Sequence, residues 1–458
     1  PGRSGPAGCY HDPVGEPMIA TLSKLYWRRY LRRNSIPTGE LDSFPKLAPP
    51  EQRRLLSERL LGQLRYFAAR PDALPEWREA ARIRNPEELW NVWPSLPVLT
   101  KDLLRQRFDP EQTQRHCGLP GRIDSTGGST GEPTRFYHDR AMLFAAAAAI
   151  HYTSLRMGWR PGMGTLCIWG SERDIGKTVP WKIRLHNTLL RQYMVDGYRL
   201  SDHTVDRLLS LALRHRPVAL YGFTTMLSYV AERILARGLQ LPPETVRAAW
   251  NGGEMLYQQD AQVFREAFGV PLLNRYGGRE LSTMACQFDP TGPLWVLRPW
   301  LFLEIVDERD KPVRPGEPGR LLWTSTICRG TPFLRYEIGD LGAADASLVD
   351  ESGIRGLGEL LGRTAGLITL ADGRRVSNLF WNHLFKGFPE VRQFQVVIRG
   401  GASILFRLAG TGMSEPRQQE LLGILGNFLP SHRFEFVWVE GIPRTRQGKL
   451  IQVVAENG

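Results

Sequence analysis

The amino-acid sequence predicts an α/β fold with a largely parallel sheet, followed by a small α+β domain. Between residues 139 and 277, short apolar segments of four to seven residues alternate with helical patterns, and several of these segments end at glycine. Two longer apolar segments, 300–307 and 319–327, flank a turn-rich stretch and indicate an antiparallel pair. A glycine-rich stretch at 353–362 precedes a second set of strand and helix patterns. We therefore expect a large domain at 1–361 and a small one at 362–458.

The bulk composition is that of an ordinary globular protein. The chain has 458 residues, 42% hydrophobic and 23% charged, which is enough for two or three domains. The net charge of +12 admits a nucleic-acid or membrane-surface partner. Neither is expected, because the arginines are scattered along the whole chain and the most apolar run, 141–150, is too short to span a membrane. The five cysteines are far apart, which indicates no zinc site and no disulfide framework and fits a cytoplasmic protein.

The large domain begins with a helical part and continues as alternating strands and helices. Residues 19–84 have a helical pattern, and apolar side chains recur at a spacing near 3.6 between Gln52 and Phe67. A break at 90–101 precedes a glycine-rich loop. The elements expected after this loop are helices at 139–157, 204–213 and 226–236, and strands at 164–170, 217–222, 246–253 and 271–277. Ligands bind beyond the carboxyl ends of parallel strands, where the glycine-containing turns of this part would lie.

The small domain is expected to mix strands and helices. Asp372-Gly373 is a hairpin turn signal between two short strands. The elements expected in this domain are strands at 367–370, 374–376, 391–399, 403–408 and 434–439, and helices at 377–388 and 415–429. A tail at 443–449 ends in Lys449, one of only eight lysines in the chain. Because lysine is rare in this sequence, Lys449 carries more weight as a candidate functional residue.

The glycine-rich loop at 124–133 is a candidate phosphate-binding loop. Glycine lets a backbone approach an anion closely, and successive backbone N–H groups and hydroxyls can donate to it. The loop is not of the Walker A type, because Gly131 is followed by Glu132. Taken alone it could equally be a surface turn. The candidate residues are Ser125, Thr126, Gly127, Gly128, Ser129, Thr130 and Gly131.

Further stretches need the same explanation as this loop. They are Asn251-Gly252-Gly253-Glu254, Tyr276-Gly277-Gly278-Arg279-Glu280, Arg335–Leu341, and Gly362-Arg363 with the distant Pro443–Lys449. Their order and spacing resemble the adenylate-forming superfamily of acyl-CoA ligases, luciferases and peptide-synthetase adenylation domains. The likeness extends from about residue 95 to the end. It is greatest to the phenylacetate–CoA ligase branch, including its capsule-biosynthesis-type relatives, through 319–326 running into 331–336 and through 372–377.

The resemblance implies a large adenylate-forming domain with mostly parallel sheets and a small mobile C-terminal domain. It also implies a chemistry: a carboxylate attacks the α-phosphate of ATP, and the site must stabilise negative charge where two anions meet. Lys449 and Glu280 would then be catalytic, Lys449 bridging the carboxylate and the α-phosphate and Glu280 holding Mg²⁺. The residues implied to bind the nucleotide are 125–131 for the β- and γ-phosphates, Gly252, Gly253, Glu254, Tyr276 and Gly277 for adenine, and Asp340 and Arg363 for ribose.

The acid site and three departures from the family follow from the same comparison. The residues expected near the acid are Trp169, Tyr221, Phe223, Gly278 and Arg279, and the aromatic rings among them favour an aryl or other flat acid. Many relatives have lysine where this chain has Glu132, and threonine where it has Arg279. The run 364–366 contains no Asp or Lys at the usual hinge position, but Gly366 would permit a swing of the small domain.

Alternatives remain open at the level of single residues and of function. Each candidate residue also has a purely structural alternative: core packing for Tyr276, a turn cap for Asp340, a surface ion pair for Arg363, a helix first-turn position for Glu280 and a solvated tail for Lys449. The function expected is an ATP- and Mg²⁺-dependent ligase that passes an acyl group to coenzyme A, acting as a monomer or homodimer. Other hypotheses keep adenylation but use an acyl carrier protein, an amine or another oxyanion, or make the chain a silent nucleotide- or nucleic-acid-binding scaffold.

Overall fold

The computed structural model describes most of the chain between residues 21 and 456. The described residues are 21–26, 38–126, 133–169, 181–196, 201–363, 368–369, 375–376, 381, 384–385, 388–399, 403–429, 431–443 and 453–456. They belong to two compact units: Pro1–Gly39, Phe144–Gly277 and Ser282–Gly292 form the first, and Glu40–Leu143, Gly278–Leu281 and Pro293–Gly458 form the second. The division expected from the sequence, 1–361 and 362–458, stays a prediction. No helix in the described ranges is both long and apolar enough to cross a membrane.

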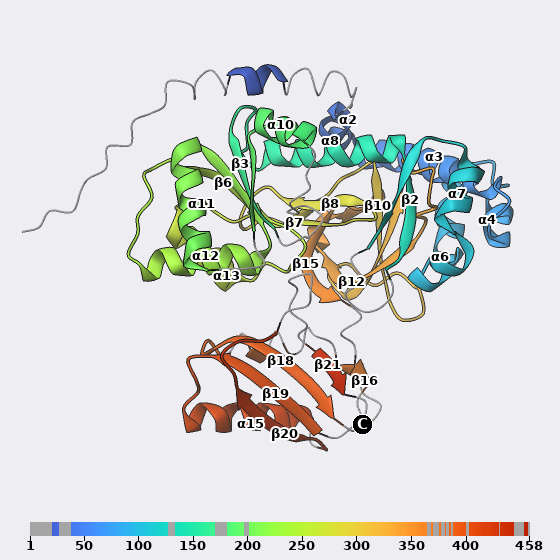
Figure 1. The fold of residues 1–458 in the computed structure, drawn as a ribbon. Coiled ribbons are helices and arrows are strands. Elements are labelled where there is room, and N and C mark those ends of the chain that lie inside the picture. The colour runs from blue at the N-terminus through green and yellow to red at the C-terminus, as the bar shows by residue number, and fades with distance from the viewer. Residues whose placement is uncertain are drawn as a thin grey trace, which may run out of the picture. The chain divides into compact units, whose positions relative to one another are not determined.

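The first unit contains the parallel sheet that the sequence predicts. Its order is β4-β3-β5-β6, and all three strand pairs are parallel (Figure 1). The bounds are β3 Gly164–Trp169, β4 Gln192–Asp196, β5 Val218–Gly222, β6 Val246–Asn251, α10 Trp181–Leu189, α11 Asp202–His215, α12 Thr224–Ala236, α13 Gln258–Phe268, β7 Arg275–Gly278 and β8 Ser282–Gln287. Each predicted strand and helix between 164 and 251 lies within one or two residues of an observed element, apart from Gly170, which is outside the described residues.

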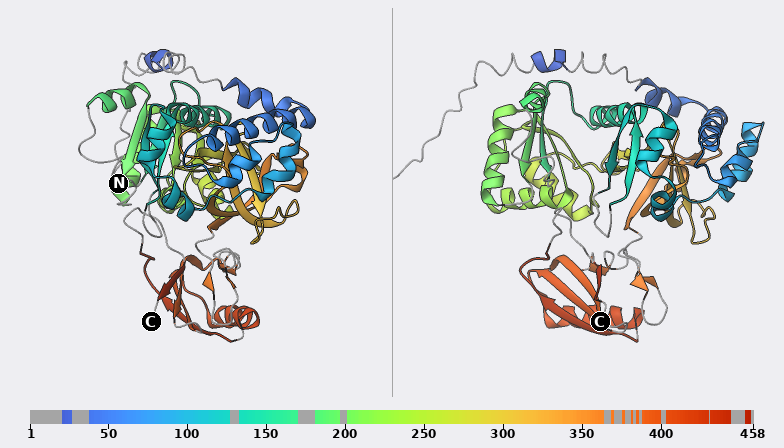
Figure 2. Two further views of the ribbon diagram at one scale, coloured as in Figure 1. Left: turned by 90° about the vertical axis from the view of Figure 1, so that its right-hand side faces the viewer. Right: turned by 45° about the vertical axis from the view of Figure 1, so that its right-hand side comes forward.

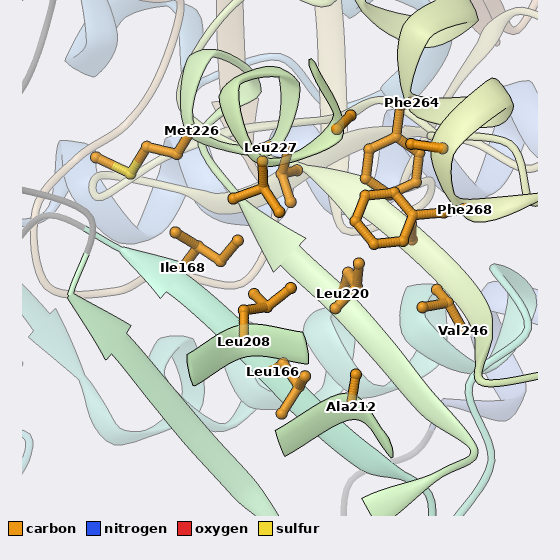
Figure 3. Packing of buried hydrophobic residues seen from close by; sticks show 14 of the residues in the cluster. Leu166, Ile168, Leu208, Ala212, Leu220, Met226, Leu227, Val246, Phe264 and Phe268 are labelled. Atoms are coloured by element: carbon orange, nitrogen blue, oxygen red, sulfur yellow. The ribbon is translucent and has the colours of Figure 1, made fainter. Parts of the chain in front are cut away.

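Both faces of this sheet are buried, as expected for parallel strands. Along β5, Leu220 packs on one side with side chains of α11, α12 and α13 (Figure 3), and Val218 belongs to the same cluster. Ala219 and Tyr221 contact the cluster on the other side. The second cluster consists of Met157, Trp159, Met163, Leu190, Ala219, Ala248, Trp250, Leu273 and Cys286. The alternation of side chains along one strand thus supplies two cores.

The second unit is built on an antiparallel sheet. The predicted pair 300–307 and 319–327 is confirmed as β10 (Leu301–Val306) and β11 (Pro318–Ser325), which pair antiparallel. The strand β12 (Tyr336–Ala344) follows β11, β15 (Gly356–Arg363) follows β12, and β9 (Leu294–Val296) pairs with β15. The glycine-rich stretch 353–362 is therefore largely strand, in β14 (Gly353–Ile354) and β15. Small residues are needed there because a Cβ on Gly356 would lie 2.6 Å from Leu348 Cδ1.

Helices from the N-terminal half complete the second unit. The helical pattern between Gln52 and Phe67 is confirmed as α3, whose leucines at 56, 60, 61 and 64 are buried. The helix predicted at 139–157 is α8, which begins in the second unit and continues from Phe144 in the first. The Asp139 carboxylate accepts from the Ala141 and Met142 N–H groups at its start. The bounds are α2 Gly39–Ser43, α3 Pro49–Ala68, α4 Pro75–Ala80, α5 Leu89–Val92, α6 Lys101–Arg107, α7 Pro110–Cys117, β1 Gly121–Ser125, β2 Arg135–Asp139, α8 Arg140–Arg156 and β13 Val349–Asp350.

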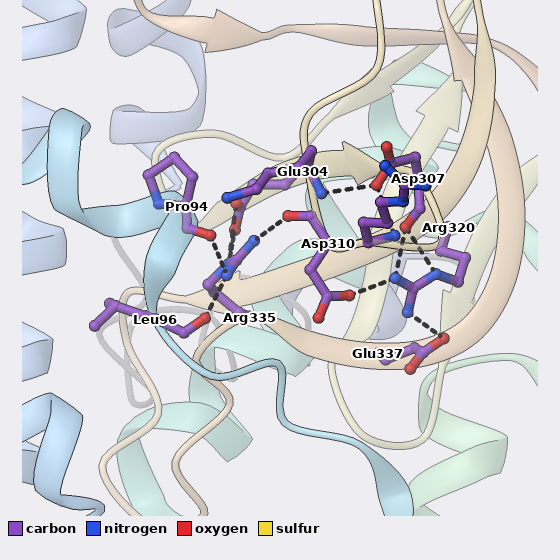
Figure 4. Close-up of polar contacts among 10 residues, drawn as sticks. Pro94, Leu96, Glu304, Asp307, Asp310, Arg320, Arg335 and Glu337 are labelled. Carbon is purple, nitrogen blue, oxygen red and sulfur yellow. Dashed lines mark hydrogen bonds and ion pairs between the residues drawn. The ribbon is translucent and has the colours of Figure 1, made fainter.

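A buried ion pair lies at the centre of the second unit. Arg335 Nε is 3.1 Å from Glu304 Oε1, and Trp93 Nε1 donates to Glu304 Oε2 at 2.9 Å (Figure 4). The same guanidinium donates to the carbonyls of Pro94 and Leu96. Burial raises the pKa of Glu304, while Arg335 and Trp93 act to lower it. Arg335 thus joins the segment before α6 to strand β10.

The C-terminal residues form a small α+β arrangement, a four-stranded sheet with one helix and its own hydrophobic core. The order is β20-β19-β18-β21; β18 and β19 pair antiparallel, and β20 and β21 are added parallel. The bounds are β18 Val391–Arg399, β19 Ser403–Gly410, α15 Glu415–Phe428, β20 Arg433–Trp438 and β21 Val453–Glu456, with β16 Ile368–Thr369 and β17 Arg375–Val376 as a short antiparallel pair. Figure 2 shows α15 along one face of this sheet, where Leu421 and Leu425 pack against Ile404 and Phe406. The predicted elements at 391–439 are confirmed, and the turn at 372–373 lies outside the described residues.

Candidate active site

The two ends of the glycine-rich loop are joined in the second unit. Strand β1 ends at Ser125 and pairs antiparallel with β2, so that Ser125 lies opposite Arg135. Beyond the pair, the Thr126 N–H donates to the Thr134 carbonyl at 2.9 Å, and the Thr134 N–H donates to Thr126 Oγ1 at 3.0 Å. Residues 127–132, which include Gly127, Gly128, Ser129, Thr130 and Gly131, lie outside the described residues. Two hydrogen bonds between Thr126 and Thr134 thus join the residues that flank the loop.

Glu280 is held by strand β12. The residue is 5% exposed and lies between β7 and β8, so it is not in a helix first turn. The Tyr336 hydroxyl donates to Glu280 Oε1 at 3.1 Å. The second carboxylate oxygen faces Gly278, where a Cβ would lie 3.0 Å from Oε2. His138 Nε2 donates to the Glu280 carbonyl oxygen at 2.7 Å, and burial lowers the pKa of His138, so its ring is neutral when it donates.

This environment fits a hard divalent cation held by a single protein carboxylate. Within the described ranges, no group of three or more His, Cys, Asp and Glu residues could hold a metal ion. Mg²⁺ is usually held by one or two carboxylates, with the remaining ligands being phosphate and water oxygens. Tyr336 occupies one oxygen of Glu280, and no described residue donates a hydrogen bond to the other. Glu280 therefore has the donor chemistry and a fixed orientation suited to such a cation.

Asp340 and Arg363 are brought together by strand pairing. Asp340 is buried and lies within β12, directly opposite Arg363 on β15. Asp340 is therefore not a turn cap, in contrast to the alternative that the sequence left open. Tyr336 and Asp340 lie four positions apart on β12, so one strand carries both the partner of Glu280 and Asp340. Arg279 reaches toward the loop, with Nη1 3.6 Å from Asp124 Oδ1.

The predicted acid residues of the first unit form a stack of aromatic rings. The ring centroids of Trp169 and Phe223 are 4.1 Å apart with an interplanar angle of 19°, and those of Trp169 and Tyr221 are 5.2 Å apart at 28°. Phe223 is buried, whereas Trp169 and Tyr221 are half-buried. Neighbouring rings cover each other's faces. These side chains therefore offer mainly their edges to a ligand.

The Gly252–Gly253 turn lies against this stack. A Cβ on Gly252 would be 2.9 Å from Tyr221 Cε2, and one on Gly253 would be 2.7 Å from Phe223 Cε1. Gly253 also has a φ of +75°, which favours glycine. Glu254 then accepts from the Thr225 N–H and hydroxyl, both at 2.9 Å, at the start of α12. The turn is thus fixed by rings on one side and by a helix N-terminus on the other.

Gly253→Ala is expected to destabilise the first unit. The matched control is Gly269→Ala, because Gly269 has a similar φ of +72° but open space around it. In the control, only the left-handed backbone conformation of alanine lowers the free energy of unfolding, by about 1–2 kcal/mol. In Gly253→Ala, the collision with Phe223 should lower the free energy of unfolding by about 1–3 kcal/mol more. Chemical unfolding of both variants measures the difference, and equal losses would contradict the tight packing of this turn.

Not every predicted site residue can be placed. Lys449 lies outside the described residues, and so does residue 132. Tyr276 lies on β7 and is half-buried, and Gly277 approaches Ser282 so closely that a Cβ would be 2.2 Å from its carbonyl oxygen. Tyr336 was not among the predicted site residues, although it lies within the motif 335–341. The only signal was a tyrosine four residues before the predicted ribose aspartate, and a contact between residues 336 and 280 cannot be inferred without the fold.

Two proteins of known name are similar to this chain in sequence. No protein-family model matches the chain. In sequence the chain is similar to the protein CapK of Staphylococcus aureus, with 26% identity over 248 residues, 54% of this chain and 52% of CapK. It thus spans about half the length of that relative. It is also similar to phenylacetate-coenzyme A ligase of Thermus thermophilus, with 23% identity over 408 residues, 83% of this chain and 85% of the ligase.

Solved structures agree with the sequence relatives. A crystal structure of 2-hydroxyisobutyryl-CoA ligase in the postadenylation state matches with a TM-score of 0.64 at 18% identity, over 89% of this chain and 90% of that one. The amide bond synthetase McbA from Marinactinospora thermotolerans matches with a TM-score of 0.53 at 19% identity, over 72% and 67%. The fold is that of the adenylate-forming ligases. The predicted resemblance is confirmed, since the homologues and structural neighbours include phenylacetate–CoA ligase and 2-hydroxyisobutyryl-CoA ligase.

Proposed function

We propose that this protein is an ATP-dependent, AMP-forming ligase that adenylates a carboxylic acid and transfers the acyl group to a thiol, that of coenzyme A. The observation that carries the proposal is the arrangement around β12. One strand holds the buried carboxylate of Glu280 through Tyr336 and carries Asp340 opposite Arg363. A buried carboxylate with one oxygen open suits Mg²⁺, and a second buried carboxylate suits the ribose hydroxyls of a nucleotide.

The reaction would proceed in two balanced steps. In the first, a carboxylate oxygen attacks the α-phosphorus of ATP, an acyl–phosphate bond forms, and pyrophosphate leaves. In the second, the sulfur of a thiolate attacks the acyl carbon, a thioester forms, and AMP leaves. Lys449 would stabilise the charge that develops between the carboxylate and the α-phosphate in the first step.

The remaining residues would bind and orient the reactants. Backbone N–H groups of residues 125–131 would bind the β- and γ-phosphates, and Asp340 would accept from the ribose hydroxyls. The Gly252–Glu254 turn and Tyr276 would bind adenine. Mg²⁺ on Glu280 would neutralise phosphate charge. Arg279 stands where many relatives have threonine and would contact a phosphate or an anionic substrate directly.

A second candidate keeps adenylation and changes the acceptor to an amine or to the thiol of an acyl carrier protein. The likeness to McbA, an amide bond synthetase, favours including it. The positive net charge of +12 would suit docking to an acidic carrier protein. In both candidates Lys449, Glu280 and Asp340 do the same work, so only the acceptor distinguishes them.

The test is pyrophosphate release with ATP and Mg²⁺ against aryl, fatty and amino acids, each with and without coenzyme A. The expected result is pyrophosphate release that depends on the acid and is faster with coenzyme A. Release that is indifferent to coenzyme A would shift the proposal to a carrier protein or an amine. Absence of release with every acid would contradict adenylation of a carboxylate and favour another oxyanion or a silent scaffold.

Tyr336→Phe is expected to raise the Mg²⁺ concentration needed for half-maximal pyrophosphate release by about 3–10-fold, because one hydrogen bond to the carboxylate is worth about 1 kcal/mol. The matched control is Tyr137→Phe, which removes a hydroxyl that donates to the Leu119 carbonyl at 2.6 Å in the same unit. Binding of Mn²⁺–ATP, followed by water-proton relaxation, gives a readout that needs no turnover. Equal metal affinities in the two variants would contradict a positioning role for Tyr336.

A further inference from the structure

Arg275 is a buried cation to which no described residue offers a hydrogen-bond acceptor. It is the first residue of β7 and is 8% exposed. Its guanidinium carbon lies 4.3 Å from the ring centroid of Tyr221 and 5.4 Å from that of Trp250. Its side chain donates no hydrogen bond and makes no ion pair with any described residue, and its Nη1 is enclosed without a partner. Ring faces attract a cation but do not replace the acceptors that its N–H groups lose on leaving water.

The other buried arginines show that this is unusual in the molecule. Each of the four others in the described ranges donates at least two side-chain hydrogen bonds to protein oxygens. Arg335 and Arg70 contact a carboxylate and backbone carbonyls, and Arg191 donates to the carbonyls of Gly162 and His215. Arg298 donates twice to Ser352. Arg275 alone among them donates no side-chain hydrogen bond to a described residue.

Among the described residues, no carboxylate forms an ion pair with Arg275. The Cys286 thiol interacts electrostatically with Arg275, and burial raises the pKa of that thiol to about 12, so it is neutral. Tyr221, the ring beneath the guanidinium, is also the ring that stacks on Trp169 and against which Gly252 lies. Arg275 therefore lies next to the residues that the sequence assigned to the acid, on the same aromatic stack.

We propose that Arg275 binds a second carboxylate of the substrate, at the end remote from the carboxylate that is activated. The substrate class is then a dicarboxylic acid. This inference rests on the proposed function, since it names the acid of that same reaction. A carboxylate would supply the charge that the buried guanidinium lacks and accept two parallel N–H donors. An acid that ends in a methyl or phenyl group would leave the cation unpaired and is disfavoured for that reason.

Matched acids that differ only at the remote end test the proposal. The pairs are phenylacetate with 4-carboxyphenylacetate and butyrate with glutarate, and 4-hydroxyphenylacetate adds a neutral acceptor. We expect kcat/KM for pyrophosphate release to favour the dicarboxylic member of a pair by at least about 10-fold. Arg275→Met should reduce this ratio to about one, and Arg275→Lys should retain part of it. An unchanged ratio in Arg275→Met, or a preference for the hydroxyl acid alone, would overturn the proposal.

Thermal unfolding supplies a readout that needs no turnover. The dicarboxylic acids should raise the Tm of the unaltered protein more than their partners do at equal concentration, and Arg275→Met should abolish the difference. Without ligand, Arg275→Met should be at least as stable as the unaltered protein, because it removes an unpaired buried charge. The control Arg191→Met, which removes two hydrogen bonds to carbonyls, should be less stable. Equal Tm shifts for both members of each pair would contradict the site even if no acid were adenylated. A larger Tm shift with the dicarboxylic acids, without pyrophosphate release, would instead contradict only the proposed function.

Discussion

Replacing Lys449 by alanine is expected to reduce acid-dependent pyrophosphate release by at least about 10²–10³-fold, the scale for losing one charge stabiliser in a transition state. The negative charge of the carboxylate and that of the α-phosphate approach each other only as the bond forms, so a cation placed there stabilises the transition state more than the bound substrates. ATP binding should be largely retained, because the other proposed nucleotide contacts are unchanged. Pyrophosphate release and equilibrium ATP binding measure the two effects separately.

Two controls make the result specific to this lysine. Lys311→Ala removes an exposed lysine from the turn between β10 and β11 and should leave both quantities unchanged. The thioester step, started from synthetic acyl adenylate and coenzyme A, should be much less affected in Lys449→Ala than adenylation. Normal pyrophosphate release in Lys449→Ala would remove this residue from the mechanism. Loss of ATP binding to the same extent as activity would make it a ground-state nucleotide contact instead.

The parts of the fold that could be predicted are those whose signal is local. The strands β3, β5 and β6 are short apolar runs, and each is followed by a helix or turn with its own sequence signal, such as Gly238 after α12. The pair β10–β11 could be predicted because a turn-rich segment joins two long apolar runs. The strand β15 could not, because its glycines carry no strand propensity. They are needed for close packing, as at Gly356, and that need appears only when its neighbours are in place.

The site divides in the same way. Asp340 and Glu280 could be assigned from the order of the motifs, because each lies in a stretch that resembles a family pattern. Their surroundings could not be predicted: Tyr336 meets Glu280 across 56 residues, and Asp340 meets Arg363 through the register of β12 and β15. The aromatic residues were assigned to the acid, but their mutual stacking and the unpaired guanidinium of Arg275 depend on the fold. Residue types therefore suffice to propose the chemistry, whereas the contacts around these residues can be described only from the fold.

Arg335→Met is expected to lower the free energy of unfolding of the second unit by about 3–5 kcal/mol, the usual cost of removing one partner of a buried ion pair. The substitution leaves Glu304 buried without its cation and also leaves the Pro94 and Leu96 carbonyls without a donor. Arg320→Met is the matched control, because its pairs with Asp310 and Glu337 on the same sheet are partly exposed (Figure 4) and should contribute about 0–1 kcal/mol. Chemical denaturation measures both variants.

The pH dependence and a double variant identify the cause of that loss. Burial already raises the pKa of Glu304, and removing Arg335 should raise it further. A group whose pKa is higher in the folded state stabilises that state at low pH, and this stability is lost as the pH rises through the folded-state value. The loss in Arg335→Met should therefore be smaller at pH 5 than at pH 8. Adding Glu304→Met should restore most of the stability, because it removes the unpaired carboxylate. An equal loss at both pH values, with no recovery in the double variant, would show that Arg335 stabilises this unit through the Pro94 and Leu96 carbonyls rather than through Glu304.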